Sequence, residues 1–279
     1  EYVVIACESC RGETTHLNCI SGLDSYEEED INSDWSETSH YRASDFEDYR
    51  KRYIGNIFQH YNLVNSYTVY QNIELILLIN GYSRDEIKRR VPDIIKRVGL
   101  ESHAGTKVSK LSGGQKQRVS IARALAKDTD IIVADEPTGN LDSVSAEGIV
   151  ELLSEIAHDK LVIVVTHNYD QFAEYVTRKI KMHDGRVVAD IRIKEDEGLP
   201  AFAVLKTEDA RREHMGREMS AASKLRLGVR NTFNIFPKFI LMLAVFMFVV
   251  FAVTSQYTAF RNQEAEEDRL GYNDYFYNY

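Results

Sequence analysis

Two adjacent carboxylates are the residues of this sequence best suited to do chemistry. Asp135 and Glu136 directly follow an apolar run that begins at Ile131. An apolar run that stops at two acids predicts a buried strand with charge at the carboxyl edge of a parallel sheet, where α/β proteins place ligands. One acid suits a hard divalent metal, and the next suits a base that activates water.

A short glycine-containing turn precedes this strand. It opens a segment whose apolar residues recur at helical spacing, which predicts a helix that begins at the turn. The backbone N–H groups at such a helix start form a site for anions. A helix start and a pair of loop acids are each common without a function, but here they occur together and lead into residues 137–142, Pro-Thr-Gly-Asn-Leu-Asp. The residues of the turn are Ser112, Gly113, Gly114 and Gln115.

Together these segments resemble the signature motif and the Walker B motif in the nucleotide-binding domain of ATP-binding cassette (ABC) transporters. The resemblance implies that Asp135 holds Mg²⁺, that Glu136 is the general base, and that Asp142 lies in the D-loop. It also implies a dimer in which residues 112–115 contact the nucleotide held by a second nucleotide-binding domain.

The beginning of the chain resembles the phosphate-binding loop of the same family. An apolar strand pattern at residues 2–6 leads into a loop and a helical run, the setting of the motif G-x-x-x-x-G-K-S/T, in which backbone N–H groups wrap phosphates. Cys7 stands in place of the first glycine, and Glu13 stands in place of the lysine. The resemblance assigns ATP binding to Ser9, Gly12, Glu13, Thr14 and Thr15, with Thr14 also a ligand of Mg²⁺.

The charge of Glu13 predicts an impaired phosphate loop. Two unit charges about 4 Å apart interact by about 4 kcal/mol at an effective dielectric constant of about 20, and about 1.4 kcal/mol changes an affinity tenfold. An anion in place of a cation therefore predicts weak ATP binding by this loop. One alternative function follows, a catalytically degenerate subunit that lends its signature motif to the site of a partner.

A second alternative rests on the cysteines. Cys7 and Cys10 have the spacing of a thioredoxin-type redox pair, and with His16 and Cys19 they make four candidate zinc ligands. Such chemistry would make the chain a redox or zinc membrane protein. The simpler interpretation is that the cysteines are small apolar residues in positions where glycine or alanine would also fit.

Two further residues gain roles from the resemblance. Gln59 follows a strand pattern at residues 53–58 and resembles the glutamine of the Q-loop, which senses the metal and the attacking water and contacts the membrane domain. His167 follows a buried strand pattern at residues 161–165 and resembles the switch histidine that contacts the γ-phosphate. Both are therefore expected beside Asp135 and Glu136, with Gln59 as a further ligand of Mg²⁺.

The intervening elements predict an α/β fold, the P-loop NTPase cassette fold with a mainly parallel sheet. Helices are expected at residues 68–79, 83–98 and 149–156, and a closing hairpin at residues 179–188. The first two resemble the helical subdomain of the cassette, at about residues 60–128. Ser83 and Glu86 form a capping box, Gly99 is a C-cap, and Pro92 is expected to disturb its helix. The acidic residues 25–48 are expected to form a solvated loop with weak strand character.

The C-terminal part predicts a membrane segment. We expect a nucleotide-binding domain at residues 1–193 with its N-terminal strands missing, a charged linker at 194–223, an interfacial helix and one transmembrane helix at 224–260, and the start of an extracytoplasmic region at 261–279. The uncharged run at residues 239–257, about 19 residues, is long enough to span a bilayer. Lys and Arg on its N-terminal side place the nucleotide-binding domain in the cytoplasm, at the plasma membrane.

Composition narrows the possible functions. A formal net charge of −9 argues against a nucleic-acid partner, and three cysteines do not make a disulfide scaffold. A cassette ahead of a first membrane helix resembles the macrolide-exporter and lipoprotein-release group. The resemblance implies an ATPase subunit that couples ATP hydrolysis to transport across the membrane or extrusion from it. Its expected cofactors are ATP and Mg²⁺, and its expected partners are a second nucleotide-binding domain in a homodimer or heterodimer, other membrane segments of the transporter, and the lipid bilayer.

Overall fold

The computed structural model describes residues 1–7, 21, 32–33, 36–37, 43–183, 186–194 and 219–277. Contacts divide the chain into two compact units, Glu1–Ser220 and Ala221–Tyr279. The residues expected to form the phosphate loop, Ser9 to Thr15, lie outside the described residues, as do Cys10, His16, Cys19 and most of the expected linker.

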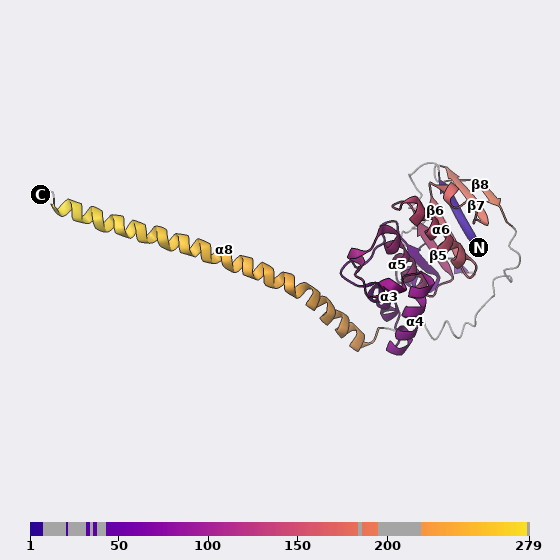
Figure 1. Cartoon of the computed structure of the whole chain (residues 1–279), viewed down its shortest axis with the longest axis horizontal. Coiled ribbons are helices and arrows are strands. Elements are labelled where there is room, and N and C mark those ends of the chain that lie inside the picture. Colours follow the sequence, from indigo (N-terminus) through magenta and orange to yellow (C-terminus); the bar gives the residue numbers. More distant parts are fainter. Residues whose placement is uncertain are drawn as a thin grey trace. The chain divides into compact units, whose positions relative to one another are not determined.

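A six-stranded sheet forms the centre of the first unit (Figure 1). Its order is β4-β5-β6-β1-β7-β8, and all neighbours are parallel except β7 and β8, which form an antiparallel hairpin. The predicted mainly parallel sheet and the closing hairpin are thus confirmed. The strands are β1 (Tyr2–Cys7), β4 (Ile54–Ile57), β5 (Ile131–Asp135), β6 (Leu161–Thr166), β7 (Arg178–His183) and β8 (Arg186–Arg192), and a separate pair consists of β2 (Asn32–Ser33) and β3 (Ser36–Glu37).

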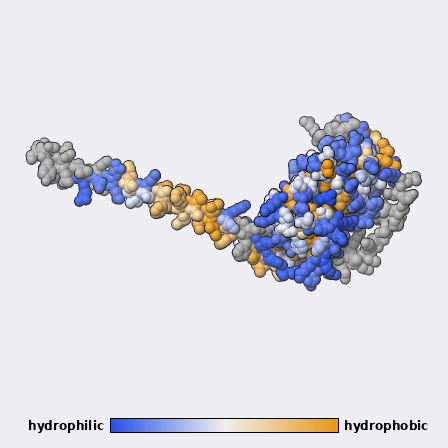
Figure 2. Space-filling model, viewed as in Figure 1, coloured by the Kyte–Doolittle hydropathy of each residue, from blue (hydrophilic) through white to orange (hydrophobic). Residues whose placement is uncertain are grey.

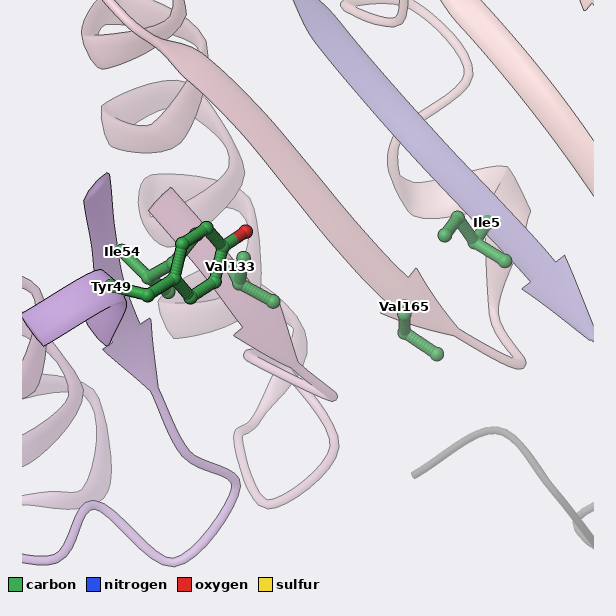
Figure 3. Close-up of a cluster of buried hydrophobic side chains, with 5 residues drawn as sticks. All are labelled: Ile5, Tyr49, Ile54, Val133 and Val165. Atoms are coloured by element: carbon green, nitrogen blue, oxygen red, sulfur yellow. The ribbon is translucent and has the colours of Figure 1, made fainter. Parts of the chain in front are cut away.

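The central strands are buried on both faces, which explains their nearly continuous apolar sequences. On one face, side chains from β1, β4, β5 and β6 pack with Tyr49 of helix α2 (Ala43–Tyr53). Figure 3 shows the Tyr49 ring over Ile54 and Val133, with Val165 and Ile5 on the next strands. This packing fixes the positions of the strand ends that carry the polar residues.

Helices α5 (Gly113–Ala126) and α6 (Ser143–Ala157) pack against each other and against the sheet, while α3 (Val69–Ile79) and α4 (Arg84–Arg97) pack on α5. Gly55 of β4 lets α5 approach closely, since a Cβ there would lie 3.0 Å from Thr129 Oγ1 and 3.2 Å from Ala124 O. Helix α5 therefore joins the helical part of this unit to the sheet.

One half-buried cation ties three helices together. The Arg118 guanidinium of α5 donates to Val98 O, at the C-terminal end of α4, at 3.0 Å and to Gly148 O of α6 at 3.1 Å. Gly99 lies just beyond the end of α4 and has a φ of +67°, the left-handed conformation that commonly terminates a helix. The sequence pattern had indicated this C-cap and the Ser83–Glu86 capping box, and both are present.

One expectation about local structure was wrong. The last part of the expected acidic loop is helical, because α2 begins at Ala43. Its aromatic residues Tyr49 and Tyr53 contact each other, with ring centroids 5.6 Å apart, and Tyr49 packs on the sheet, so tertiary packing stabilises this polar helix. Pro92 lies inside α4 without ending it. Burial of Ile87, Val91 and Ile95 on one face holds this helix together.

The second unit is one long helix, α8 (Ala221–Tyr277), of 57 residues. Its segment Phe236–Glu266 is long and apolar enough to cross a membrane by length and composition, and Figure 2 shows this apolar stretch with hydrophilic residues beyond it. The interfacial and membrane segments expected from the sequence belong to a single continuous helix. Pro237 does not interrupt it.

Replacing Ile54 by alanine should lower the free energy of unfolding by about 2–5 kcal/mol, because this fully buried side chain leaves a cavity between α2 and β5. Chemical denaturation of the purified chain measures the change. Val144→Ala is the matched control, since Val144 is 79% exposed, and it should change stability by less than about 0.5 kcal/mol. Equal effects of the two substitutions would contradict the described core.

Candidate functional site

The two acids lie where the sequence predicts them, at the carboxyl edge of the sheet. Asp135 is the last residue of β5, and the Glu136 N–H donates to Val165 O of β6 at 3.0 Å. Glu136 has a φ of +44°, a left-handed conformation that costs free energy for a residue with a side chain. Strain of this kind is concentrated at functional sites. The left-handed backbone turns the chain sharply at the strand end and directs the Glu136 side chain toward β6.

Three hydrogen bonds hold the Glu136 carboxylate. The Thr166 hydroxyl donates to Oε2 at 3.2 Å, and the His167 backbone N–H donates to Oε1 at 2.8 Å. His167 Nδ1 also lies 2.5 Å from Oε1. The Glu136 side chain is 12% exposed and that of His167 is 63% exposed, so the imidazole covers the carboxylate on the solvent side. Oε2 has one donor and keeps capacity to accept another hydrogen bond.

The surroundings of Asp135 disfavour its ionised form. Partial burial and the neighbouring Glu136 raise the pKa of its carboxyl group, and His60 partly offsets this. None of the residues that the structure describes donates a hydrogen bond to this carboxylate. A half-buried carboxylate beside a second one suits a hard divalent cation, because oxygen ligands and negative charge are what such a cation prefers.

Gln59 lies in the loop that follows β4 and approaches the residues after Glu136. Asn140 Nδ2 donates to Gln59 O at 3.2 Å, and a Cβ on Gly139 would lie 3.3 Å from Gln59 Nε2. A short hydrogen bond from Arg123 of α5 to Asn62 O joins the same loop to the helix that carries the glycine turn. The strand ends at one edge of the sheet therefore hold four of the predicted site residues, Gln59, Asp135, Glu136 and His167.

The glycine turn begins α5 as predicted. Ser112 is the N-cap, its hydroxyl accepts from Gln115 N at 3.3 Å, and Gln115 Oε1 accepts from Ser112 N at 3.0 Å. Gly114 is buried against α6, since a Cβ there would lie 3.0 Å from both Cβ and Oγ of Ser145. Ser112 is exposed and Gly113 half-exposed, so the start of α5 can be reached from outside.

Asp142 caps the neighbouring helix α6. Its carboxylate accepts from Ser145 N at 2.9 Å and from Ser145 Oγ at 2.8 Å, and these bonds lower the pKa of Asp142. Asp142 and the glycine turn therefore meet through Ser145. Among the described residues, no hydrogen bond joins this pair of helix starts to the Asp135–Glu136 pair.

The strand that precedes the expected phosphate loop leads to the same edge as the acids. Ala6 of β1 pairs with Thr166 of β6, and β1 ends at Cys7. Of the predicted loop residues, Ser9, Gly12, Glu13, Thr14 and Thr15 lie outside the described part of the chain. Within that part, no cluster of three or more His, Cys, Asp or Glu residues is arranged to hold a metal ion.

Thr166 is a site residue that the sequence interpretation missed. It is fully buried, donates to Glu136, and accepts from Asn168 N at 3.1 Å. The available signal was its place between a buried strand and His167.

Replacing Asp135 by asparagine should stabilise the ligand-free fold at neutral pH. The pKa of Asp135 is raised in the folded state, so its ionised form opposes folding, and this cost disappears as the pH falls through that pKa. The melting temperature of Asp135→Asn should therefore exceed that of the unchanged chain at pH 7, with a gap that closes toward pH 4. Asp93→Asn, at an exposed position of α4, is the control. A constant gap across the pH range would refute this explanation.

The family model, the related sequences and the solved structures that match this chain all belong to one family. Residues 1–139 match the family model described as ABC transporter. The chain is 37% identical over 196 residues to the ABC transporter ATP-binding protein YtrE of Bacillus subtilis (strain 168), a match that covers 70% of this chain and 84% of YtrE. It is 38% identical over 191 residues to the macrolide export ATP-binding/permease protein MacB of Mannheimia succiniciproducens, covering 68% of this chain and 30% of MacB. The chain thus spans about a third of the length of that exporter.

Solved structures agree with these relatives. The ATP-binding cassette MJ0796, in a dimeric post-hydrolysis state bound to ADP and Pi, matches with a TM-score of 0.63 and 36% identity over 70% of this chain and 86% of that chain. CbiO1 from Clostridium perfringens, part of the ABC transporter complex cbiONQ, matches with a TM-score of 0.63 and 28% identity over 69% of this chain and 77% of its own.

These matches favour the transporter ATPase over the redox, zinc and degenerate-partner alternatives. Family members of this kind bind ATP, usually with Mg²⁺, and their cassettes function as dimers. The chain belongs to the ATP-binding proteins of ABC transporters, a family of ATPases.

Proposed function

We propose that this chain couples hydrolysis of Mg²⁺·ATP to transport across, or extrusion from, the plasma membrane, and that each nucleotide lies between two nucleotide-binding domains. The observation that carries the proposal is the Glu136 carboxylate, held by Thr166 and His167 at the edge where β1 and β5 also end. A carboxylate fixed in this way is oriented to act as a base toward a water molecule that attacks a phosphate bound in front of it.

Three residues would hold Mg²⁺ in this site. Asp135 supplies the strand-end carboxylate, and Gln59 and Thr14 are the further ligands expected from the resemblance. The half-buried, hydrogen-bond-poor environment of the Asp135 carboxylate fits this role. Bound Mg²⁺ would supply positive charge to the phosphates. Ser9, Gly12, Thr14 and Thr15 would bind the phosphates, with Glu13 unfavourable among them.

Glu136 is the group that would activate water. Its Oε1 already accepts two hydrogen bonds from His167, whereas Oε2 accepts only one, from Thr166. Oε2 would therefore accept the proton of the attacking water while the bond between the γ-phosphorus and the bridging oxygen breaks. His167 would keep the carboxylate in place and lie next to the γ-phosphate.

The glycine turn would serve the nucleotide of the partner. Ser112 is exposed and Gly113 half-exposed, and the helix start they form offers N–H groups to an anion. Among the described residues, nothing links this turn by hydrogen bonds to the acids of its own chain, which favours a contact with a second chain. Asp142, which holds Ser145 beneath the turn, would lie at the same interface.

Helix α8 would anchor the cassette in the bilayer. Its uncharged run at residues 239–257 follows Lys224, Arg226, Arg230 and Lys238, and acids follow this run from Glu264 onward. By the positive-inside rule, this asymmetry would put residues 1–193 and the linker 194–223 on the cytoplasmic side, the membrane-associated part at 224–260, and residues 261–279 outside. The name of the relative MacB describes macrolide export. The corresponding proposal here is that the chain extrudes a substrate as part of an assembly that contains further membrane segments.

The shared site predicts that two defective chains restore each other. Glu136→Gln should lower ATP hydrolysis by about 100-fold or more, and Gly114→Ala should lower it because the added Cβ meets Ser145. In a mixed dimer, one site carries both defects and the other is intact. Mixing the two variants should therefore recover activity in a phosphate-release assay.

Gly105→Ala is the control for the glycine substitution, since nothing lies within 4 Å of a Cβ added there. It should leave hydrolysis and melting temperature unchanged. Failure of the two defective chains to restore activity on mixing would exclude a nucleotide site shared between chains.

The phosphate loop can be tested by restoring its cation. Glu13→Lys should tighten binding of Mg²⁺·ATP by at least about tenfold, because it replaces repulsion of the phosphates by attraction. Isothermal titration of the purified chain measures the affinity. Glu101→Lys makes the same change in net charge at an exposed position and should leave the affinity unchanged. Tight binding by the unchanged chain would show that Glu13 does not face the phosphates.

A further inference from the structure

A line of hydrogen-bonded side chains, formed by Ser102, His103 and Gln115, leads from the short helix η2 (Glu101–His103) to the glycine turn. Ser102 Oγ lies 2.9 Å from His103 Nδ1, and His103 Nε2 lies 3.1 Å from Gln115 Nε2. The other end of the Gln115 amide, Oε1, accepts from Ser112 N at 3.0 Å. The first residue of the turn is thus connected to His103 through one amide group.

The chemistry of these groups fixes the direction of every hydrogen bond in the line. Gln115 Oε1 is the acceptor for Ser112 N–H, so Nε2 is the atom that faces His103. An amide nitrogen only donates, and His103 Nε2 must therefore accept. A neutral imidazole with an accepting Nε2 carries its hydrogen on Nδ1, which donates to Ser102 Oγ.

The capping box of α3 gives an internal comparison. There Thr68 and Gln71 make the same pair of bonds, at 3.0 and 3.2 Å. Among the described residues, no histidine makes a hydrogen bond to the Gln71 amide. A capping box of this kind therefore forms without a ring behind it, and His103 adds a constraint on the amide orientation that the helix start alone does not require.

We propose that His103 is a positioning residue for the glycine turn. By accepting from Gln115 Nε2, it keeps Gln115 Oε1 on Ser112 N–H, and so fixes how Ser112 and the first N–H groups of α5 face a phosphate. This inference rests on the proposed function, in which those groups meet the nucleotide of the partner. His103 itself touches no nucleotide and acts through Gln115.

A spectroscopic test examines the line without reference to activity. In the full chain labelled with ¹⁵N-histidine, the His103 signals are identified by their loss in His103→Gln. Long-range proton–nitrogen correlation spectra should show the Nδ1–H tautomer at His103, and Gln115→Ala should shift the ring toward the Nε2–H form. An Nε2–H ring in the unchanged chain, or a ring unaffected by Gln115→Ala, would overturn the proposal.

A kinetic cycle tests the consequence for hydrolysis. His103→Leu should lower kcat by about 3- to 10-fold, the range expected for one hydrogen bond, and His103→Gln, which restores an acceptor, should recover most of it. In a Gln115→Ala background, His103→Leu should have no further effect. An equal loss in both backgrounds would contradict action through Gln115. His158→Leu, at an exposed position, is the control and should keep full activity.

The proposed function and the positioning role of His103 can be refuted separately. If Glu136→Gln and Gly114→Ala chains do not restore each other, the shared site is wrong, and the tautomer of His103 still decides whether the line exists. If they do restore each other while His103→Leu keeps full kcat and the ring is in the Nε2–H form, the proposed function stands and the role of His103 is refuted.

Discussion

The structure depends on two like charges at the end of a buried strand. Asp135 and Glu136 are consecutive, and partial burial together with the neighbouring Glu136 raises the pKa of Asp135. The fold separates their environments: the left-handed backbone of Glu136 turns its carboxylate to Thr166 and His167, while Asp135 remains half-buried with no donor among the described residues. One acid is thereby held by hydrogen bonds, and the other is left suited to a cation. The parallel order of β1, β5 and β6 makes this division possible, because it brings three strand ends to one edge.

Close approaches between backbone segments position the glycine turn and the helix α5 that carries it. Gly114 lets the start of α5 lie against Ser145, and Gly55 lets the other end of α5 lie on β4. Arg118 then joins α5 to the end of α4 and to α6. The glycine turn is therefore carried by a helix that is fixed at both ends, and a hydrogen bond from Arg123 joins the same helix to the loop that contains Gln59.

The sequence predicted the strand ends and the helix start that carry the site residues better than it predicted some of the supporting structure. The strand that ends at Asp135, the helix that begins at Ser112 and the hairpin near the end of the first unit follow from apolar periodicity and capping residues, which are local signals. Helix α2 was missed because it is stabilised by Tyr49 packing on distant strands. Thr166 and His103 were missed for the same reason: each acts through one hydrogen bond to a residue 30 or 12 positions away in the chain. Local patterns cannot indicate partners that only the fold brings together.

The central claim is a triphosphate shared by two chains, and its most direct test is an experimental structure of the Glu136→Gln dimer at saturating Mg²⁺·ATP. The account predicts one nucleotide at each interface, with its β-phosphate in the loop of residues 9–15 of one chain and its γ-phosphate at Ser112 and Gly113 of the other. The Asp135 carboxylate should face the metal. A nucleotide bound within a single chain, with residues 112–115 of the partner exposed to solvent, would contradict the account.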